Sequence, residues 1–363
     1  RKTSRVENAD AGEIILKRFF ALSLILFLTG CLSNPNLWGS SLPPEPAVTS
    51  IYYPTETDTA TLTPAPTSTL IPTKTSVPTI TITPTPSKAS IERVLIISYD
   101  GMRPDAIGKA PMPNLLKLAE NSAYSFTSDR TINYPATSPS HASMLSGLCM
   151  EKHGIVLNKY FKYMGYSKGV DIFDLAHAAS LKTVMIVSKD KLRQMAEPET
   201  TDVFEVRYGE PAVAREAVAQ IAEGFGLMFI HFAGPDNRGH KYGWMSGEQL
   251  KVLREGDVAL GEILAALEEN NLLETTLIIV TADHGGHDKN HIGLIIEDYR
   301  IPWIAFGPGI VPVELTLPMY TMDTAVTAAY ALGLPLQPDW DGIPIYEAFG
   351  LPMQATHEND PCK

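Results

Sequence analysis

The chain has 363 residues and a formal net charge of −12 at pH 7, with 29 basic and 41 acidic side chains. This acidic balance, without any basic cluster, argues against tight binding of a nucleic-acid backbone, so no nucleic-acid duplex is expected as a partner. Only three cysteines are present and no CxxC pair occurs, which disfavours a thiolate zinc site.

The first segment, residues 1–31, has the pattern of a secretory signal. Lys17 and Arg18 precede the apolar run Phe19 to Leu28, which is too short to cross a bilayer, since about 20 residues are needed. The sequence LTGC, which ends at Cys31, resembles the lipobox of bacterial lipoproteins. We therefore expect Cys31 to carry a lipid anchor and the protein to be extracytoplasmic and bound to the cell membrane. A buried helix and an uncleaved anchor are the alternatives.

Residues 32–90 differ in composition, being mostly Thr, Pro, Ser and Ala, as in TATLTPAPTSTLIPTKTSVPTITITPTPSK. Such a segment offers little large apolar surface, and its prolines remove backbone hydrogen-bond donors. We predict a disordered, extended stalk here, and leave open whether it is glycosylated.

Residues 91–350 are enough for one large α/β domain, with a C-terminal tail over residues 351–363. Apolar, β-branched runs predict strands at Val94–Tyr99, Thr183–Ser188, Leu227–Phe232, Thr276–Ala282 and Ile301–Gly307. The last run is weakened as a strand by its proline. Near-continuous apolar runs are typical of strands buried on both faces of a parallel sheet.

Helical patterns separate these strands. One begins near Pro113, another covers PAVAREAVAQIAEGF, and a third is long, with Ser246 as its expected N-cap. The alternation of strand and helix predicts an α/β fold with a mostly parallel central sheet and helices on both faces.

Acidic and imidazole side chains follow three of these strands. Asp100 follows the first, while later strands lead to Asp236 with His240 and to Asp283 with His284. Each residue alone also fits a helix cap or a surface position. In open α/β sheets, however, sites form beyond the carboxyl ends of the strands, where converging carboxylates need a cation. A mixed Asp/His donor set suits zinc, with manganese or iron as alternatives.

The stretch over residues 134–158 holds three candidate nucleophiles, Thr137, Ser138 and Ser140, although a helix cap is the alternative, for Ser140 above all. Six motifs in order resemble the alkaline phosphatase superfamily, and most closely its nucleotide pyrophosphatase/phosphodiesterase (type I phosphodiesterase) family. The motifs are DGMRPD (100–105), TSPSH (137–141), SG (146–147), HGIVLN (153–158), PDNRGHKYG (235–243) and ADHGG (282–286). The resemblance covers nearly all of residues 91–350 and implies an alkaline-phosphatase-like fold.

The resemblance also implies two divalent metal ions, zinc in the first place and manganese as the alternative. One ion would be held by Asp236, His240 and His291, and the other by Asp100, Thr137, Asp283 and His284. Two such ions clamp the attacking and leaving oxygens of a displacement at phosphorus, and Thr137 would form a phospho-threonine intermediate. Asn158, which lies 21 positions after Thr137, would bind substrate by donating to a non-bridging phosphate oxygen.

The stretch TADHGGHDKNH, residues 281–291, contains more potential ligands than one ion can use. The resemblance assigns His291 to the ion shared with Asp236. His287 and Asp288 are not expected to bind metal. His287 is interpreted as a solvated loop residue, with a role in shaping the pocket or contacting substrate as the alternative.

Several positions stay open from the sequence. Tyr160 and Tyr242 are candidates for substrate contacts, with a surface loop or core packing as the alternative for the aromatic segment around Tyr160. The segment GWMS, residues 243–246, has no assigned role. A disulfide between Cys149 and Cys362 is possible outside the cytoplasm, but we do not favour it because nothing in the sequence shows the tail folding back.

We expect a metal-dependent hydrolase of phosphodiester or nucleotide pyrophosphate bonds in a small phosphate-ester or nucleotide substrate. A phosphomonoesterase or phosphonate hydrolase of the same superfamily is the first alternative. A sulfatase is disfavoured, because that pattern needs Cys or Ser where Thr137 stands and Arg where His141 stands. A catalytically inactive surface-binding lipoprotein is the alternative of another class. Oligomeric state stays open.

Overall fold

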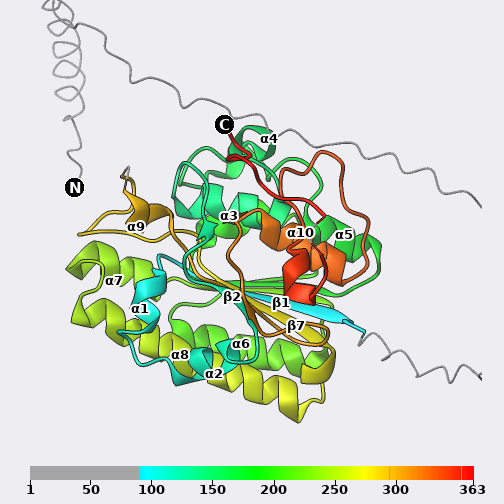
Figure 1. Cartoon of the computed structure of the whole chain (residues 1–363), viewed down its shortest axis with the longest axis horizontal. Coiled ribbons are helices and arrows are strands. Elements are labelled where there is room, and N and C mark those ends of the chain that lie inside the picture. The colour runs from blue at the N-terminus through cyan, green and yellow to red at the C-terminus, as the bar shows by residue number, and fades with distance from the viewer. Residues whose placement is uncertain (1–89, 294, 353) are drawn as a thin grey trace, which may run out of the picture. The chain divides into compact units, whose positions relative to one another are not determined.

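The computed structural model of the chain describes residues 90–293, 295–352 and 354–363 (Figure 1). The predicted signal region, its Cys31 and the predicted stalk up to residue 89 lie outside the described residues. The described residues fall in one compact unit of the chain. Among them, no helix combines the length and apolar character needed to cross a bilayer.

A mixed sheet lies at the centre of the described chain, with the strand order β5-β4-β6-β1-β7-β8-β2-β9. The strands are β1 Arg93–Tyr99, β2 Ala123–Ser125, β4 Thr183–Val187, β5 Val203–Val206, β6 Leu227–Phe232, β7 Thr276–Thr281, β8 Trp303–Phe306 and β9 Val313–Glu314. From β5 to β7 all neighbours are parallel, whereas β8 is antiparallel to both β7 and β2. The predicted mostly parallel central sheet is therefore confirmed. A separate ladder pairs β3 Asp129–Arg130 with β10 Met319–Tyr320.

Helices cover both faces of this sheet, as predicted. Figure 1 shows α2, α6 and α8 below the sheet and α3, α5 and α10 above it. The helices are α1 Pro104–Ile107, α2 Pro113–Ala119, α3 Thr137–Ser146, α4 Met150–His153, α5 Ile172–Ala178, α6 Glu210–Glu223, α7 Gly234–Tyr242, α8 Gly247–Glu269, α9 Ile296–Tyr299 and α10 Asp323–Ala331. Short 3₁₀ turns are η1 Lys162–Met164, η2 Asp190–Met195, η3 Leu273–Thr275 and η4 Tyr346–Phe349.

The alternation of side chains along the central strands divides the core into two layers. In β1, Val94 and Ile96 pack with the helices of one face, whereas Leu95 and Ile97 pack with those of the other. Successive side chains of a strand point to opposite faces, so a strand buried on both faces needs an unbroken apolar run. The long helix α8 begins after Ser246, whose side chain accepts a hydrogen bond from the Gln249 N–H, as the capping prediction required.

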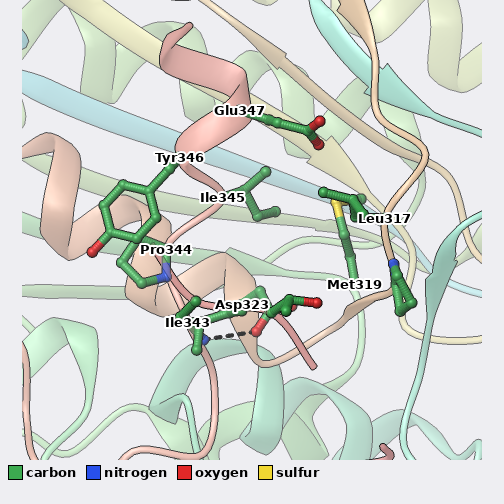
Figure 2. Close-up of a pocket in the computed structure, with 11 residues that line it drawn as sticks. Leu317, Met319, Asp323, Ile343, Pro344, Ile345, Tyr346 and Glu347 are labelled. Atoms are coloured by element: carbon green, nitrogen blue, oxygen red, sulfur yellow. Dashed lines mark hydrogen bonds between the residues drawn. The ribbon is translucent and has the colours of Figure 1, made fainter. Parts of the chain in front are cut away.

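The C-terminal tail folds back onto the domain, which the sequence did not indicate. Cys149 and Cys362 form a disulfide with Cα atoms 5.5 Å apart, so the unpaired interpretation is wrong. His357 of the tail is buried and bonds the Asp323 carboxylate at 2.8 Å. Figure 2 shows Asp323 at the base of a small pocket, accepting a 2.8 Å hydrogen bond from the Ile343 N–H. These contacts join segments far apart in sequence, and no local pattern encodes them.

Candidate active site

Three neighbouring strands deliver the predicted ligands to one edge of the sheet. Because β1 lies between β6 and β7, the residues that follow these strands come together, and Asp100, Asp236, Asp283 and His284 are all buried there. Ligand atoms of Asp236, His240 and His291 lie within 4.8 Å of one another, and so do those of Asp100, Asp236 and His284. The first group is the predicted one, whereas the second contains Asp236 where Asp283 was predicted.

Asp100 and Asp236 each have one bonded and one unbonded carboxylate oxygen. Asp100 Oδ2 accepts from His231 Nε2 at 2.9 Å and lies 2.6 Å from Lys189 Nζ. Asp236 Oδ2 also lies 2.6 Å from Lys189 Nζ, so this ammonium joins the two carboxylates. The other oxygen of each, Oδ1, is buried and makes no hydrogen bond within the described chain.

Asp283 shows the same pattern. Its Oδ1 accepts the backbone N–H groups of Gly101 and His284, each at 3.0 Å, while its Oδ2 is buried without a hydrogen bond. His284 Nε2, 3.3 Å from that Oδ2, also has no hydrogen bond among the described residues. Unbonded buried carboxylate oxygens are costly unless a cation binds them, so this donor set fits a divalent ion held by single oxygens.

The three histidines are oriented alike. Each uses Nδ1 for a hydrogen bond to a backbone carbonyl, which fixes the tautomer and turns Nε2 toward the aspartates. The pairs are His240 with Lys289 O at 3.0 Å, His284 with Gly285 O at 2.9 Å and His291 with Pro135 O at 2.5 Å. His240 Nε2 lies 3.3 Å, and His291 Nε2 3.9 Å, from Asp236 Oδ1. Burial lowers the pKa of His284, whereas the contact with Asp236 raises the pKa of His240. All three imidazoles present Nε2 as a possible metal ligand.

The electrostatics of the site favour ligation. Burial would raise the pKa of Asp100, but Lys189 and His231 outweigh it and hold this pKa well below the usual range. Burial, followed by the charge of Asp100, raises the pKa of Asp283 to about 7. Burial also lowers the pKa of His291 to about 3, so its imidazole is neutral at physiological pH. A bound cation would stabilise the ionised form of Asp283.

Thr137 is the first residue of α3 and is buried. Its Oγ1 lies 3.4 Å from Lys189 Nζ, the same ammonium that joins the two aspartates. The helix N-cap is Ala136, so the capping interpretation of the nearby hydroxyls is wrong. Ser140 lies inside the helix, where its Oγ accepts a hydrogen bond from Thr131 at 3.0 Å. Of the three candidate nucleophiles, Thr137 is the one bonded to a group of the ligand cluster.

Asn158 stands beside Thr137, held through its side-chain oxygen. Oδ1 accepts from the Ser138 N–H at 3.0 Å and from Lys191 Nζ at 2.7 Å. With both acceptor positions used, the Nδ2 amide remains as a donor for a ligand. Lys189 and Lys191 were not identified from the sequence. The signal was available, because both follow the buried strand β4, next to β6, and strand ends had already located the aspartates.

Trp244 fills the space behind two of the histidines, which gives GWMS a role. Its ring lies 5.2 Å from that of His240 and 5.9 Å from that of His291, and its Nε1 donates to Gly101 O at 2.9 Å. A Cβ on Gly286 would lie 2.1 Å from Trp244 Cε2. The second glycine of ADHGG is therefore required by the approach of this ring.

The remaining candidates are outside the two ligand groups. His287 Nδ1 bonds the buried carboxylate of Asp298 at 2.7 Å, while 29% of the His287 side chain stays exposed. This loop histidine is therefore partly solvated and also held by a carboxylate. The ligand groups of the described chain contain neither His287 nor Asp288, and their exclusion as metal ligands stays a prediction. Tyr242, at the end of α7, lies 5.0 Å from the ammonium of Lys241, and Tyr160 lies in the loop after Asn158.

The fold and the ordered motifs are those of the alkaline phosphatase superfamily. The family model described as type I phosphodiesterase / nucleotide pyrophosphatase matches residues 94–180 and 188–299, more than half of the chain. The chain belongs to this family. The family depends on metal ions, and the two ligand groups are candidate sites for them.

Similar proteins agree with this assignment. Over 221 residues, 55% of this chain and 48% of the relative, the chain is 25% identical to bis(5'-adenosyl)-triphosphatase enpp4 of Xenopus laevis. Over 250 residues, 61% of this chain and 54% of the relative, it is 25% identical to ectonucleotide pyrophosphatase/phosphodiesterase family member 7 of Homo sapiens. The chain thus spans about half the length of these curated relatives.

Solved structures show the same fold. A 2-O GAG sulfatase superposes with a TM-score of 0.61 at 16% identity, covering 74% of this chain and 76% of that chain. Murine ectonucleotide pyrophosphatase/phosphodiesterase 5 gives a TM-score of 0.58 at 18% identity, covering 71% of this chain and 99% of that chain. The alkaline-phosphatase-like architecture predicted from the sequence is confirmed.

Proposed function

We propose that this protein is a two-metal hydrolase of phosphodiester or nucleotide pyrophosphate bonds, with Thr137 as its nucleophile. The observation that supports the proposal most strongly is the pattern shared by Asp100, Asp236 and Asp283. Each is buried, uses one oxygen within the protein and leaves the other unbonded beside an imidazole nitrogen. Carboxylates held by one oxygen and imidazoles presented through Nε2 match zinc coordination, with manganese as the alternative.

The proposed ligands divide into two sets. One ion would be held by Asp236, His240 and His291, and the other by Asp100, Thr137, Asp283 and His284. The first set is supported by its three ligand atoms, which lie within 4.8 Å of one another. The second is supported by His284 Nε2, which lies 3.4 Å from Asp100 Oδ1 and 3.3 Å from Asp283 Oδ2.

When bound, the ions would supply positive charge that acidifies the nucleophile and offsets charge on the reacting oxygens. Thr137 Oγ1 would lose its proton to solvent and attack phosphorus, forming a phospho-threonine as the leaving group departs with its bonding electrons. Asn158 Nδ2 would donate to a non-bridging phosphate oxygen. Water would then attack the phospho-threonine, releasing phosphate product and restoring Thr137. The Lys189 ammonium, 3.4 Å from Thr137 Oγ1, would favour its alkoxide.

Phosphomonoester or phosphonate hydrolysis is the second candidate, and the two lysines favour it. Lys189 and Lys191 add two ammonium groups beside Thr137, in a partly buried setting where charge is weakly screened. A phosphoryl group with two negative charges gains more from them than a diester with one. The relatives named for dinucleoside triphosphate hydrolysis suggest that a polyphosphate chain could use the same charge.

A substrate panel with metal analysis on the same sample tests the proposal. An aryl phosphodiester, its aryl phosphate monoester and a nucleotide pyrophosphate would be compared by kcat/KM, with zinc and manganese measured per chain. We expect turnover of the diester or the pyrophosphate and two ions per chain. A strong preference for the monoester would establish the second candidate instead, and absence of turnover with absence of metal would support an inactive binding protein.

We also propose that Cys31 carries a lipid and holds the protein outside the cytoplasm, at the cell membrane. The Cys149–Cys362 disulfide supports such a location, because disulfides persist mainly in oxidising compartments. Replacement of Cys31 by Ser should release the protein from the membrane fraction. Retention of that variant in the membrane would contradict the anchor.

A further inference from the structure

Resting on the proposed function, we propose that His231 is a positioning residue for the metal ion on the Thr137 side. It holds the Asp100 carboxylate so that Oδ1, rather than Oδ2, is presented to the ion. His231 lies in β6, outside every motif identified in the sequence, and its side chain is fully buried.

The contact follows from the pairing of β1 with β6. Ser98 is opposite His231 and Tyr99 is opposite Phe232, and the Asp100 N–H bonds Phe232 O at 3.0 Å. The backbone of Asp100 is therefore fixed to the same strand that carries His231. From there, His231 Nε2 reaches Asp100 Oδ2 at 2.9 Å, while Asp100 Oδ1 stays unbonded beside His284.

The tautomer of His231 is set by the end of β4. The Ser188 N–H points at His231 Nδ1 at 3.3 Å, so Nδ1 accepts and the proton lies on Nε2. Ser188 Oγ also donates to His231 O at 3.2 Å. His231 thus donates to Asp100, which leaves the carboxylate ionised and one oxygen free for a cation.

A second buried histidine keeps the ring in place. The His141 ring lies 5.0 Å from that of His231, edge to face at 79°. His141 is itself held by Thr137 O at Nδ1 and by Ser98 Oγ at Nε2, each at 2.8 Å. The two rings therefore support both the carboxylate of Asp100 and the first turn of α3, where the nucleophile stands.

Lys189 does not duplicate this role. Its ammonium is shared between Asp100 and Asp236, at 2.6 Å from each, and ends a long flexible side chain. His231 bonds Asp100 and not Asp236, and its side chain is fully buried. Loss of such a partner behind a metal ligand typically weakens metal affinity by about 10–100-fold.

The test is zinc binding to the metal-free full chain, measured by calorimetric titration with Zn²⁺ alone, without substrate. For His231→Phe we expect one of two zinc affinities to fall by about 10–100-fold while the other is unchanged. His231→Gln should recover most of the loss, because a glutamine amide can donate near the position of Nε2. His231→Asn should not, because its amide reaches only the position of Nδ1. The last two variants give the comparison if His231→Phe does not fold.

His357→Phe is the matched control, since His357 is also buried and bonded to a carboxylate, that of Asp323. It should lower the unfolding temperature and leave both zinc affinities unchanged. Unchanged zinc affinities in His231→Phe, or equal losses in His231→Gln and His231→Asn, would overturn the inference while leaving the proposed function intact. Absence of zinc uptake by the natural sequence would overturn the proposed function and this inference with it.

Discussion

Gly286 lies so close to Trp244 that no larger side chain fits at this position. The Trp244 ring occupies the space where any larger side chain at this position would stand, and it backs the rings of His240 and His291. Two properties of glycine are used at this position, the positive φ of +158° and the absence of Cβ beside the Trp244 ring.

Gly286→Ala is expected to destabilise the protein by about 1–3 kcal/mol, because the added methyl group must displace the indole or the backbone. Zinc affinity should fall with it, since Trp244 supports two ligands. Urea unfolding measures the first effect and calorimetry the second. Gly309→Ala is the control, because φ is also positive there, +77°, and nothing lies within 4 Å of a Cβ. Equal stability of the two variants would contradict the packing role of Trp244.

Asn158 and Lys191 should act as one unit. Asn158→Ala removes a donor to the phosphate and is expected to lower kcat by about 100-fold or more. Lys191→Met leaves Asn158 Oδ1 with the Ser138 N–H alone and should lower kcat by a smaller factor. When Asn158 is already Ala, Lys191→Met should lower kcat by a much smaller factor than it does in the natural sequence. Fully additive losses in kcat would show that Lys191 does not act through Asn158.

At the scale of elements, the strand ends explain why the site was predictable. Long apolar runs identified β1, β4, β6 and β7, and the residues after three of them supplied the aspartates. The antiparallel direction of β8 was not predictable, because strand direction depends on the connection from β7. Pro302 precedes β8 and shortens the predicted run, since proline lacks the N–H that a ladder needs. The two- and three-residue strands β2 and β9 are too short for a periodic pattern.

The ladder of β3 with β10 buries Asp129 without a partner for Oδ2 in the described chain. Burial, and next the charge of Asp323, raise the pKa of Asp129 well above its usual range. The folded state then binds this proton more tightly than the unfolded state, whose Asp pKa is about 3.9. The contribution of this proton to the free energy of unfolding is fully present below about pH 3.9. It is lost as the pH rises through the pKa of Asp129 in the folded state.

Asp129→Asn should therefore raise the free energy of unfolding at neutral pH and flatten its fall between acidic and neutral pH. Urea unfolding over that range measures both effects. Asp339→Asn, at an exposed position, is the control and should keep the slope of the natural sequence. A pH slope in Asp129→Asn equal to that of the natural sequence would show that Asp129 does not carry the buried proton.

Across the whole molecule, the sheet order determines which predictions were within reach. Residues that follow adjacent parallel strands meet at one edge, so the ligands could be expected to converge from the sequence alone. Lys189 follows strand β4 and was within reach of the same rule. His231 and Trp244 were not, because they act through contacts between segments far apart in sequence. The disulfide to Cys362 is of the same kind. The metal ligands and the nucleophile were predictable from residue types and their order. Apart from Lys189, the residues that hold these side chains in place became visible only in the packed structure.

The central claim is a metal-assisted attack by Thr137 on phosphorus. Its most direct test compares the natural sequence with Thr137→Ala for turnover of one aryl phosphodiester, with bound zinc measured in both samples. We predict that Thr137→Ala loses turnover by a factor of about 10³ or more while most of its zinc remains, because Asp and His side chains supply the other ligands. Full turnover by Thr137→Ala would contradict the account.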